Sequence, residues 1–90
     1  MQLKHRIVSL NGTAQNLVVR EATDSRNTLS IQNVADSGFA YLGGYGVTSS
    51  NYGYKLFPGQ SFIIEMASSD NIYAVGDSGV SVAIFNIDRG

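Results

Sequence analysis

Short runs that alternate apolar and polar residues, each ended by turn residues, restrict the fold of this chain more than any other feature. The first run, residues 2–10, places Leu3 and Ile7 on one side and Lys4 and Arg6 on the other. Later runs are rich in Val, Ile, Tyr, Phe and Thr, and no window combines helical periodicity with helix caps. A period of two residues is that of a half-buried strand, so the sequence predicts an all-β protein.

The turn signals divide the chain into eight candidate strands, which lie at residues 2–10, 13–20, 28–34, 39–43, 54–57, 61–66, 71–75 and 80–87. Seven or eight short strands at this spacing suggest a β-sandwich or a small barrel, and we expect a small antiparallel β-sandwich of the jelly-roll or immunoglobulin-like type. The length, and the lack of any linker, predict a single domain spanning residues 1–90.

Two dipeptides predict tight turns of defined type. Asn11-Gly12 is the strongest short hairpin signal, because both residue types tolerate positive φ. Pro58-Gly59 predicts a type II turn, since Pro58 presets φ at the first central position and Gly59 supplies positive φ at the second.

An internal echo relates IQNVADSGFAYL, which begins at Ile31, to IYAVGDSGVSVA, which begins at Ile72. We expect both Asp-Ser-Gly units to be hairpin loops, with Gly38 and Gly79 left-handed and each Asp capping its own turn. The two units are either pseudo-equivalent hairpins of one sandwich or one good turn solution used twice.

Composition excludes several ways of stabilising so short a chain. Cysteine is absent and there is one histidine, so neither disulfides nor zinc-finger sites can form. Small domains of this kind are often stabilised by assembly, which favours a homo-oligomer or a docked subunit. No stretch approaches the roughly 18 apolar residues of a membrane span, and no signal-peptide pattern follows the N-terminus. We therefore expect a soluble, unprocessed protein that binds no membrane.

Charge is unevenly distributed along the chain. The net charge of −1 argues against a dedicated nucleic-acid-binding protein. Residues 1–20 carry three basic residues and no acid, giving +3, and the remainder carries three basic and seven acidic residues, giving −4. This is either chance scatter or a basic N-terminal strand that meets an acidic partner. In the second case residues 1–10 form an edge strand or docking arm, with Lys4, His5 and Arg6 as candidate interface residues.

Candidate catalytic and metal-binding groups are scarce. His5, the only histidine, lies near the start of the chain, where a rigidly held nucleophile–base pair is not expected. Turn capping accounts for Asp36 and Asp77, and Glu65 alternates with apolar neighbours and should face solvent. Calcium-loop and phosphate-loop patterns are absent. We expect no enzyme activity, no catalytic residue, no metal and no cofactor.

Residues 41–60 hold four of the five tyrosines and five of the ten glycines. Such a segment is either a surface that stacks on sugars or bases, or the packing and turn chemistry of a β domain. Lys55 is its only charged residue, which is too little positive charge for a nucleic-acid stacking platform.

The segment from Asn27 to Ile87 contains motifs in a characteristic order: LSIQNV, the aromatic strand FAYLGG, then VTSSNYGYKLFPGQSF, and finally IYAV and VSVAIFNI. In this order they resemble a family of small virion proteins of tailed bacteriophages, in which VTxxNGxxLxPGxS is a recurring skeleton. The chain departs from the skeleton at Tyr52, where an extra residue separates Asn51 from Gly53. Residues 1–26 are not covered.

The resemblance implies a non-enzymatic β-sandwich that is made in the host cytoplasm and becomes a structural part of the phage particle. The first expectation is a capsid decoration, or cement, protein on the head exterior, which binds the major capsid protein or other virion proteins as a homo-oligomer such as a trimer. The alternative is a receptor- or glycan-binding module of a tail or head fibre.

The resemblance also suggests roles for residues of the tyrosine-rich segment. Its glycines act as backbone turns, Leu56 and Phe62 belong to the core, and Tyr41 packs as a core or cross-strand aromatic. The remaining tyrosines lie in the loop-rich part and are candidate interface residues, because tyrosine is enriched at protein–protein contacts. These are Tyr45, Tyr52 and Tyr54.

Overall fold

The structure, a computed structural model, describes residues 2–18, 26–67 and 70–88. Within them the chain forms eight strands and no helix, which confirms the all-β prediction. The strands are β1 (Gln2–Ser9), β2 (Gln15–Asn16), β3 (Arg26–Asn33), β4 (Ala40–Gly43), β5 (Tyr54–Leu56), β6 (Ser61–Ala67), β7 (Tyr73–Gly76) and β8 (Ser81–Asp88). A helix able to cross a membrane does not occur in this part of the chain.

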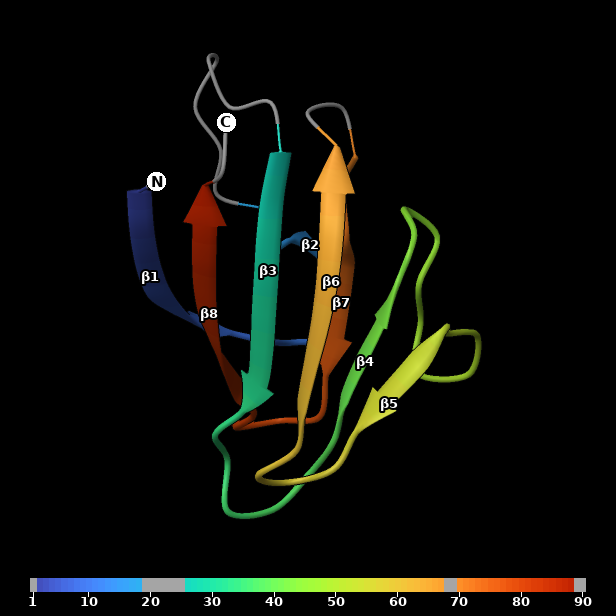
Figure 1. Cartoon of the computed structure of the whole chain (residues 1–90). Coiled ribbons are helices and arrows are strands. Elements are labelled where there is room, and N and C mark those ends of the chain that lie inside the picture. The colour runs from blue at the N-terminus through green and yellow to red at the C-terminus, as the bar shows by residue number, and fades with distance from the viewer. Residues whose placement is uncertain (1, 19–25, 68–69, 89–90) are drawn as a thin grey trace.

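The strands form two antiparallel sheets, sheet A with the order β1-β8-β3-β6 and sheet B with the order β2-β7-β4-β5 (Figure 1). The pairing is that of one long hairpin bent at the β4–β5 connection: β4 pairs with β5, β3 with β6, β2 with β7 and β1 with β8. The pairs β3–β8 and β4–β7 then complete the two sheets. This is the strand order of a jelly roll, the first of the two sandwich types that the sequence favours.

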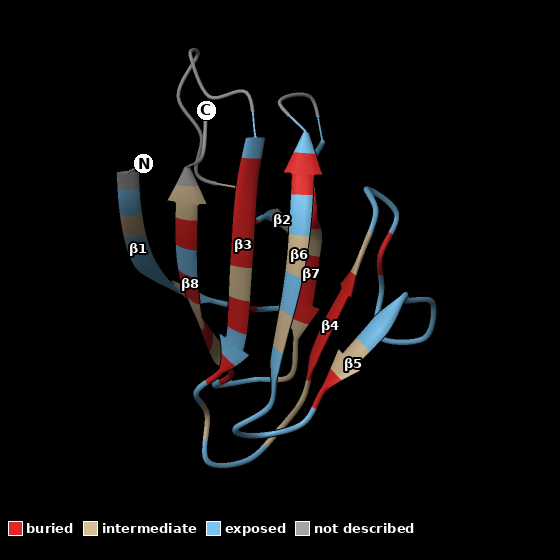
Figure 2. Ribbon diagram, viewed as in Figure 1, coloured by how far each residue is buried: buried red, intermediate tan, exposed pale blue. Residues whose placement is uncertain are grey.

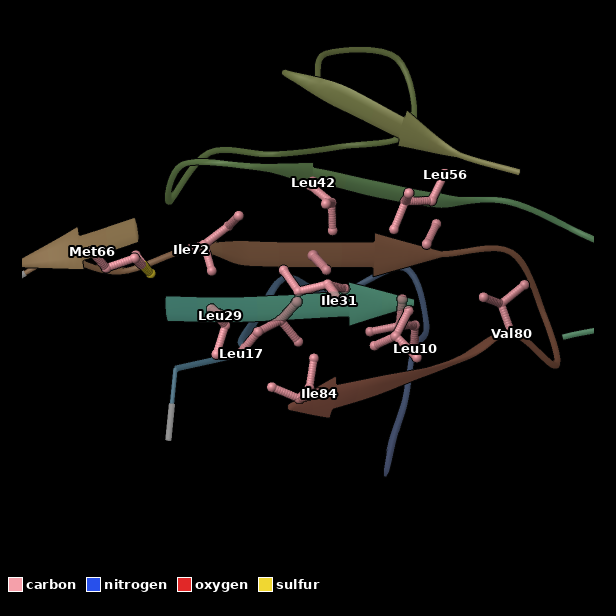
Figure 3. Packing of buried hydrophobic residues seen from close by; sticks show 13 residues of the cluster. Leu10, Leu17, Leu29, Ile31, Leu42, Leu56, Met66, Ile72, Val80 and Ile84 are labelled. Carbon is pink, nitrogen blue, oxygen red and sulfur yellow. The ribbon is translucent and has the colours of Figure 1, made fainter. Parts of the chain in front are cut away.

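The core lies between the two sheets and uses the inward positions of the alternating runs. Leu29 and Ile31 of β3 and Ile84 of β8 are almost fully buried and belong to one hydrophobic cluster with Leu42 of sheet B (Figure 3). Buried and more exposed residues alternate along β8 and along β3 from Leu29 onward, whereas Asn27 and Thr28 are buried together with Leu29 (Figure 2). The predicted alternation therefore separates core from surface on these central strands.

The predicted hairpin at Asn11-Gly12 is wrong, because β1 and β2 lie in different sheets. β1 pairs with β8 along its whole length, and Gly12 is not among the described glycines with positive φ. Asn11 instead accepts a hydrogen bond on its Oδ1 from the Thr13 N–H at 2.8 Å. Of the second predicted strand only β2 forms among the described residues, and residues 19–25 lie outside them.

The two Asp-Ser-Gly units are also corners between the sheets, so the prediction of hairpin loops is wrong. The left-handed glycines are confirmed, with φ of +91° at Gly38 and +84° at Gly79. Asp77 does not cap its own turn: its Oδ2 accepts the N–H of Phe39, in the other corner, at 2.9 Å. The Asp77 N–H donates in return to the Phe39 carbonyl oxygen, so the two corners lie side by side.

The internal echo follows from the symmetry of the strand order. If four is added to each strand number of sheet A, with β1 following β8, the order β1-β8-β3-β6 becomes β5-β4-β7-β2. This is the strand order of sheet B read in the opposite direction. The β3–β4 corner and the β7–β8 corner are therefore equivalent positions in two halves of the chain. This favours pseudo-equivalence over repeated use of one turn, with corners in place of hairpins.

The Pro58-Gly59 turn is confirmed. The Gln60 N–H donates to the Phe57 carbonyl oxygen at 2.9 Å, and Gly59 has φ of +83°, as a type II turn requires. This turn carries the chain from β5 in sheet B to β6 in sheet A.

Replacing Gly59 by valine is expected to lower the free energy of unfolding by about 1 kcal/mol or more, because a β-branched residue is strained at positive φ. A thermal melt followed by circular dichroism measures the change. Gly12→Val is the matched control, since a Cβ at either glycine meets no atom within 4 Å but Gly12 is not at positive φ. Equal melting temperatures for the two variants would contradict the strain argument.

Candidate functional site

The structure gives the three N-terminal candidates different environments on β1, which is an edge strand of sheet A. His5 is exposed and lies between Leu3 and Ile7 on the outer side of the sheet. Lys4 lies on the inner side with its ammonium nitrogen buried. Arg6 is exposed but donates from its guanidinium to the Asn16 carbonyl oxygen of sheet B at 3.2 Å. Lys4 is therefore not presented to a partner, and His5 is the outward-facing member of the three.

The apolar side of β1 faces solvent, which reverses the arrangement expected of an amphipathic strand. Leu3 and Ile7 belong to the outer surface of sheet A together with Phe85 of β8 and Ile63 of β6, and these four side chains are between 41% and 66% exposed. We call these four residues the apolar face.

Strand pairing places the apolar face across the whole sheet. His5 pairs with Phe85, Phe85 with Ser30, and Ser30 with Ile63, so one row of neighbours crosses all four strands. Ala83, the partner of Ile7, also lies on this surface. Ser30 and Ala83, the neighbours of Phe85 on this surface, are small, so they do not screen the phenylalanine ring from a flat partner. Exposed apolar clusters of this kind mark interaction sites in soluble proteins.

Sheet B carries a second cluster on its outer surface. Tyr41 and Val75 are buried there although they point away from the core, so β4 is covered on both sides (Figure 2). The prediction that Tyr41 packs as a cross-strand aromatic is confirmed. The rings of this surface, which we call the aromatic face, belong to Phe39, Tyr41, Tyr45, Tyr52, Phe57 and Tyr73.

Lys55 is held within the aromatic face. Its ammonium nitrogen lies 4.1 Å from the ring centre of Phe39 and 5.4 Å from that of Phe57. These two rings meet edge to face with their centres 5.0 Å apart. Lys55, the single charged residue of the tyrosine-rich segment, is thus held by cation–π attraction to neighbouring rings of its own sheet. Burial raises the pKa of the neighbouring Tyr41 hydroxyl, and the Asp77 carboxylate and Tyr52 raise it further, so this phenol stays protonated.

The three candidate tyrosines do not share one surface. Tyr45 and Tyr52 lie on the aromatic face, where Tyr45 is 83% exposed beside Tyr73 and Tyr52 packs 5.0 Å from Tyr41. Tyr54 is at the opposite side of sheet B, with its ring centre 4.8 Å from that of Phe62. Tyr45 and Tyr52 lie outside the strands, as the resemblance suggested, whereas Tyr54 begins β5, where the alternation predicted a strand at residues 54–57.

An apolar groove of about 370 Å³ opens between β6 of sheet A and the β4–β5 pair of sheet B. Tyr54 and Phe62 both line it, and Phe62, expected in the core, is only half-buried there. We call it the edge groove; its large side chains are Leu42, Tyr54, Phe62, Ile64, Met66 and Ile72.

Among residues 2–18, 26–67 and 70–88, no three His, Asp or Glu side chains come together to hold a metal ion. Glu65 is exposed on β6, as predicted. The surfaces can bind by apolar contact and aromatic stacking.

A scan against protein-family models finds no match for this chain, and a search of curated protein sequences finds none either.

The apolar face is the feature that sequence reasoning missed. The alternation of residues 2–10 separates the apolar from the basic side chains but does not say which side faces the core. Ile63 carried a signal, because it occupies the same side of its run as Glu65, which was expected to face solvent. Because residues two apart in a strand point to the same side, this pattern would have predicted that Ile63 is exposed.

Proposed function

We propose that this protein is a structural component of a tailed-phage particle, most simply a decoration protein that binds the head lattice from outside and stabilises it without catalysis. The motif order of residues 27–87 supports the particle assignment by resemblance. The jelly-roll order is compatible with it, since this architecture occurs in viral capsid proteins among others.

The apolar face is the observation that supports docking most strongly. Four large apolar side chains on one four-stranded surface are unfavourable in water and become favourable when a partner covers them. Phe85 lies on a central strand of that surface and is the natural anchor, because aromatic residues near the centre of an interface dominate binding energy. A lattice repeats the partner many times, so modest contacts add up to stable coating.

Replacing Phe85 by serine is expected to weaken binding to particles of the source phage assembled without this protein, by roughly tenfold or more. Co-sedimentation with such particles measures the affinity. Tyr45→Ser, on the opposite surface, is the control and should bind like the wild type. Unaltered binding of Phe85→Ser, with its thermal melt also unaltered, would show that the apolar face is not the docking surface.

The alternative is a receptor- or glycan-binding module of a fibre or tail, and one observation favours it. Tyr45 and Tyr52 lie on the same surface as a polar hollow of about 350 Å³ that includes Tyr52 and Asn51 in its lining. Exposed tyrosine beside polar side chains suits sugar stacking. In this case Tyr45→Ser should abolish binding to host-cell glycans, and imaging of the particle should find a handful of copies instead of hundreds.

A further inference from the structure

Sheet A has two edge strands of nearly equal length. β1 has eight residues and β6 has seven, and within the described residues each pairs with a neighbour on one side only. The unpaired side of an edge strand carries backbone N–H and C=O groups that can pair with another chain.

The two sheets are offset sideways, so a different sheet extends further at each of the two edges of the sandwich. Figure 1 shows β1 extending past β2 at one end and β5 extending past β6 at the other. At the first end, inward-facing Arg6 is exposed and Val8 is half-buried. At the second end, the edge groove lies beneath β5, and the inward-facing ring of Tyr54 is 42% exposed. At one end a strand of sheet A thus extends past the edge of sheet B, and at the other end a strand of sheet B extends past the edge of sheet A.

Charge also differs between the two edges. β1 carries Lys4, His5 and Arg6 and no acidic residue up to Ser9, whereas Glu65 is the only charged residue of β6. His5 and Glu65 both point outward and are both exposed. The β1 edge therefore complements the β6 edge of a second molecule in charge as well as in shape.

We propose that copies of this protein join head to tail, with β1 of one copy pairing as an antiparallel strand with β6 of the next and covering the edge groove. The strand directions permit this, because four antiparallel strands place a neighbouring copy's β1 antiparallel to β6. The occupant of the groove is a second copy of this chain. The inference does not depend on the proposed function, since it concerns self-association in solution.

The lengths and face alternation of the two strands select one register. Outer residues must pair with outer residues, and only one such register pairs all seven residues of β6 with β1. It places Ile63 opposite Ile7, Glu65 opposite His5 and Ala67 opposite Leu3 on the outer side.

On the inner side, the same register places Phe62 opposite Val8 of the second copy and Ile64 opposite its Arg6. The arginine stem would then lie at the mouth of the edge groove, where Tyr54 and Phe62 offer aromatic faces to the guanidinium. The same pairing brings Ile63 of one copy to the apolar face of the next, so the apolar faces become continuous. A head-to-tail contact of this kind closes into a ring or continues as a filament.

The absence of cysteine allows a direct test of the register. Ile7→Cys protein and Ile63→Cys protein are mixed under mild oxidation, and disulfide-linked dimers are counted by mass spectrometry. The expected result is a mixed dimer in large excess over either homodimer. The off-register control replaces Ile63→Cys by Ser61→Cys, which lies two residues along β6 and should cross-link much less, because a disulfide tolerates little error in Cβ separation.

Charge exchange tests the same contact without a covalent bond. His5→Glu and Glu65→Lys should each weaken self-association by about two- to five-fold in sedimentation-equilibrium measurements, and the double variant should recover it. A wild-type protein that stays monomeric at millimolar concentration overturns the proposal, and its inward basic side chains then protect the β1 edge from pairing. Equal cross-linking of the on- and off-register pairs also overturns it. Loss of particle binding in Phe85→Ser leaves these results unchanged, so failure of the proposed function and failure of this inference are distinguishable.

Discussion

Asn33→Ala is expected to lower the free energy of unfolding by about 2–4 kcal/mol, because the substitution strips three hydrogen bonds from the interior. Asn33 is fully buried at the end of β3. Its Nδ2 donates to the carbonyl oxygens of Leu56 at 3.1 Å and Gly38 at 3.2 Å, and its Oδ1 accepts from the Ala35 N–H at 3.0 Å. One side chain thus joins β3 to β5 of the other sheet and to the corner that leads to β4. Alanine would leave those backbone groups without this partner, with little access to water.

Asn16→Ala is the matched control. The Oδ1 of Asn16 also accepts from the N–H two residues on, that of Val18 at 3.0 Å, and its Nδ2 also donates to an oxygen, the Oδ1 of Asn71 at 3.1 Å. Asn16 is exposed, so water replaces these bonds and the cost should stay below about 1 kcal/mol. Urea unfolding, analysed for midpoint and slope, measures both. If the two variants cost the same, burial does not set the strength of the Asn33 bonds.

Gly38→Ala is expected to cost about 2–4 kcal/mol of unfolding free energy, and Gly79→Ala only about 1 kcal/mol. Both glycines end an Asp-Ser-Gly unit at nearly the same positive φ, so both substitutions carry the same backbone strain. A Cβ at Gly38 would also lie 2.7 Å from Cγ2 of Val80, whereas a Cβ at Gly79 meets nothing within 4 Å. Val80 is 1% exposed and β-branched, so it cannot turn away easily.

A double variant separates strain from crowding. Val80→Ala removes the crowding methyl, so adding Gly38→Ala to that background should cost only the strain, about 1 kcal/mol. Thermal and urea unfolding of the wild type, the two single variants and the double variant complete this double-mutant cycle. Equal costs for the two glycines in the wild-type background, or no recovery with Val80→Ala, would refute close packing of the two corners.

Local rules account for the parts of this fold that were predicted. Alternation identifies strand segments because successive side chains leave a strand on opposite sides, and this holds whatever the strand pairs with. The left-handed Gly38, Gly59 and Gly79 follow from residue chemistry within a few positions. The packing of Tyr41 was implied by the resemblance, not by a local rule, and its side chain is buried as implied. For the candidate site, the resemblance suggested Tyr45, Tyr52 and Tyr54 as exposed tyrosines, and all three side chains are exposed in the structure.

Contacts between residues distant in the chain determined which strands pair and which side of each strand faces the core. Asn11-Gly12 and the Asp-Ser-Gly units end strands as predicted, but the strands on either side join different sheets, since β1 finds its partner in β8 at the far end of the chain. Likewise, the pattern of β1 has two distinct sides, and its register with β8 decides that Leu3 and Ile7 face outward while Lys4 faces inward. A strand's own sequence specifies only its period. The side that is buried depends on where the second sheet lies, and that is a property of contacts between residues distant in the chain.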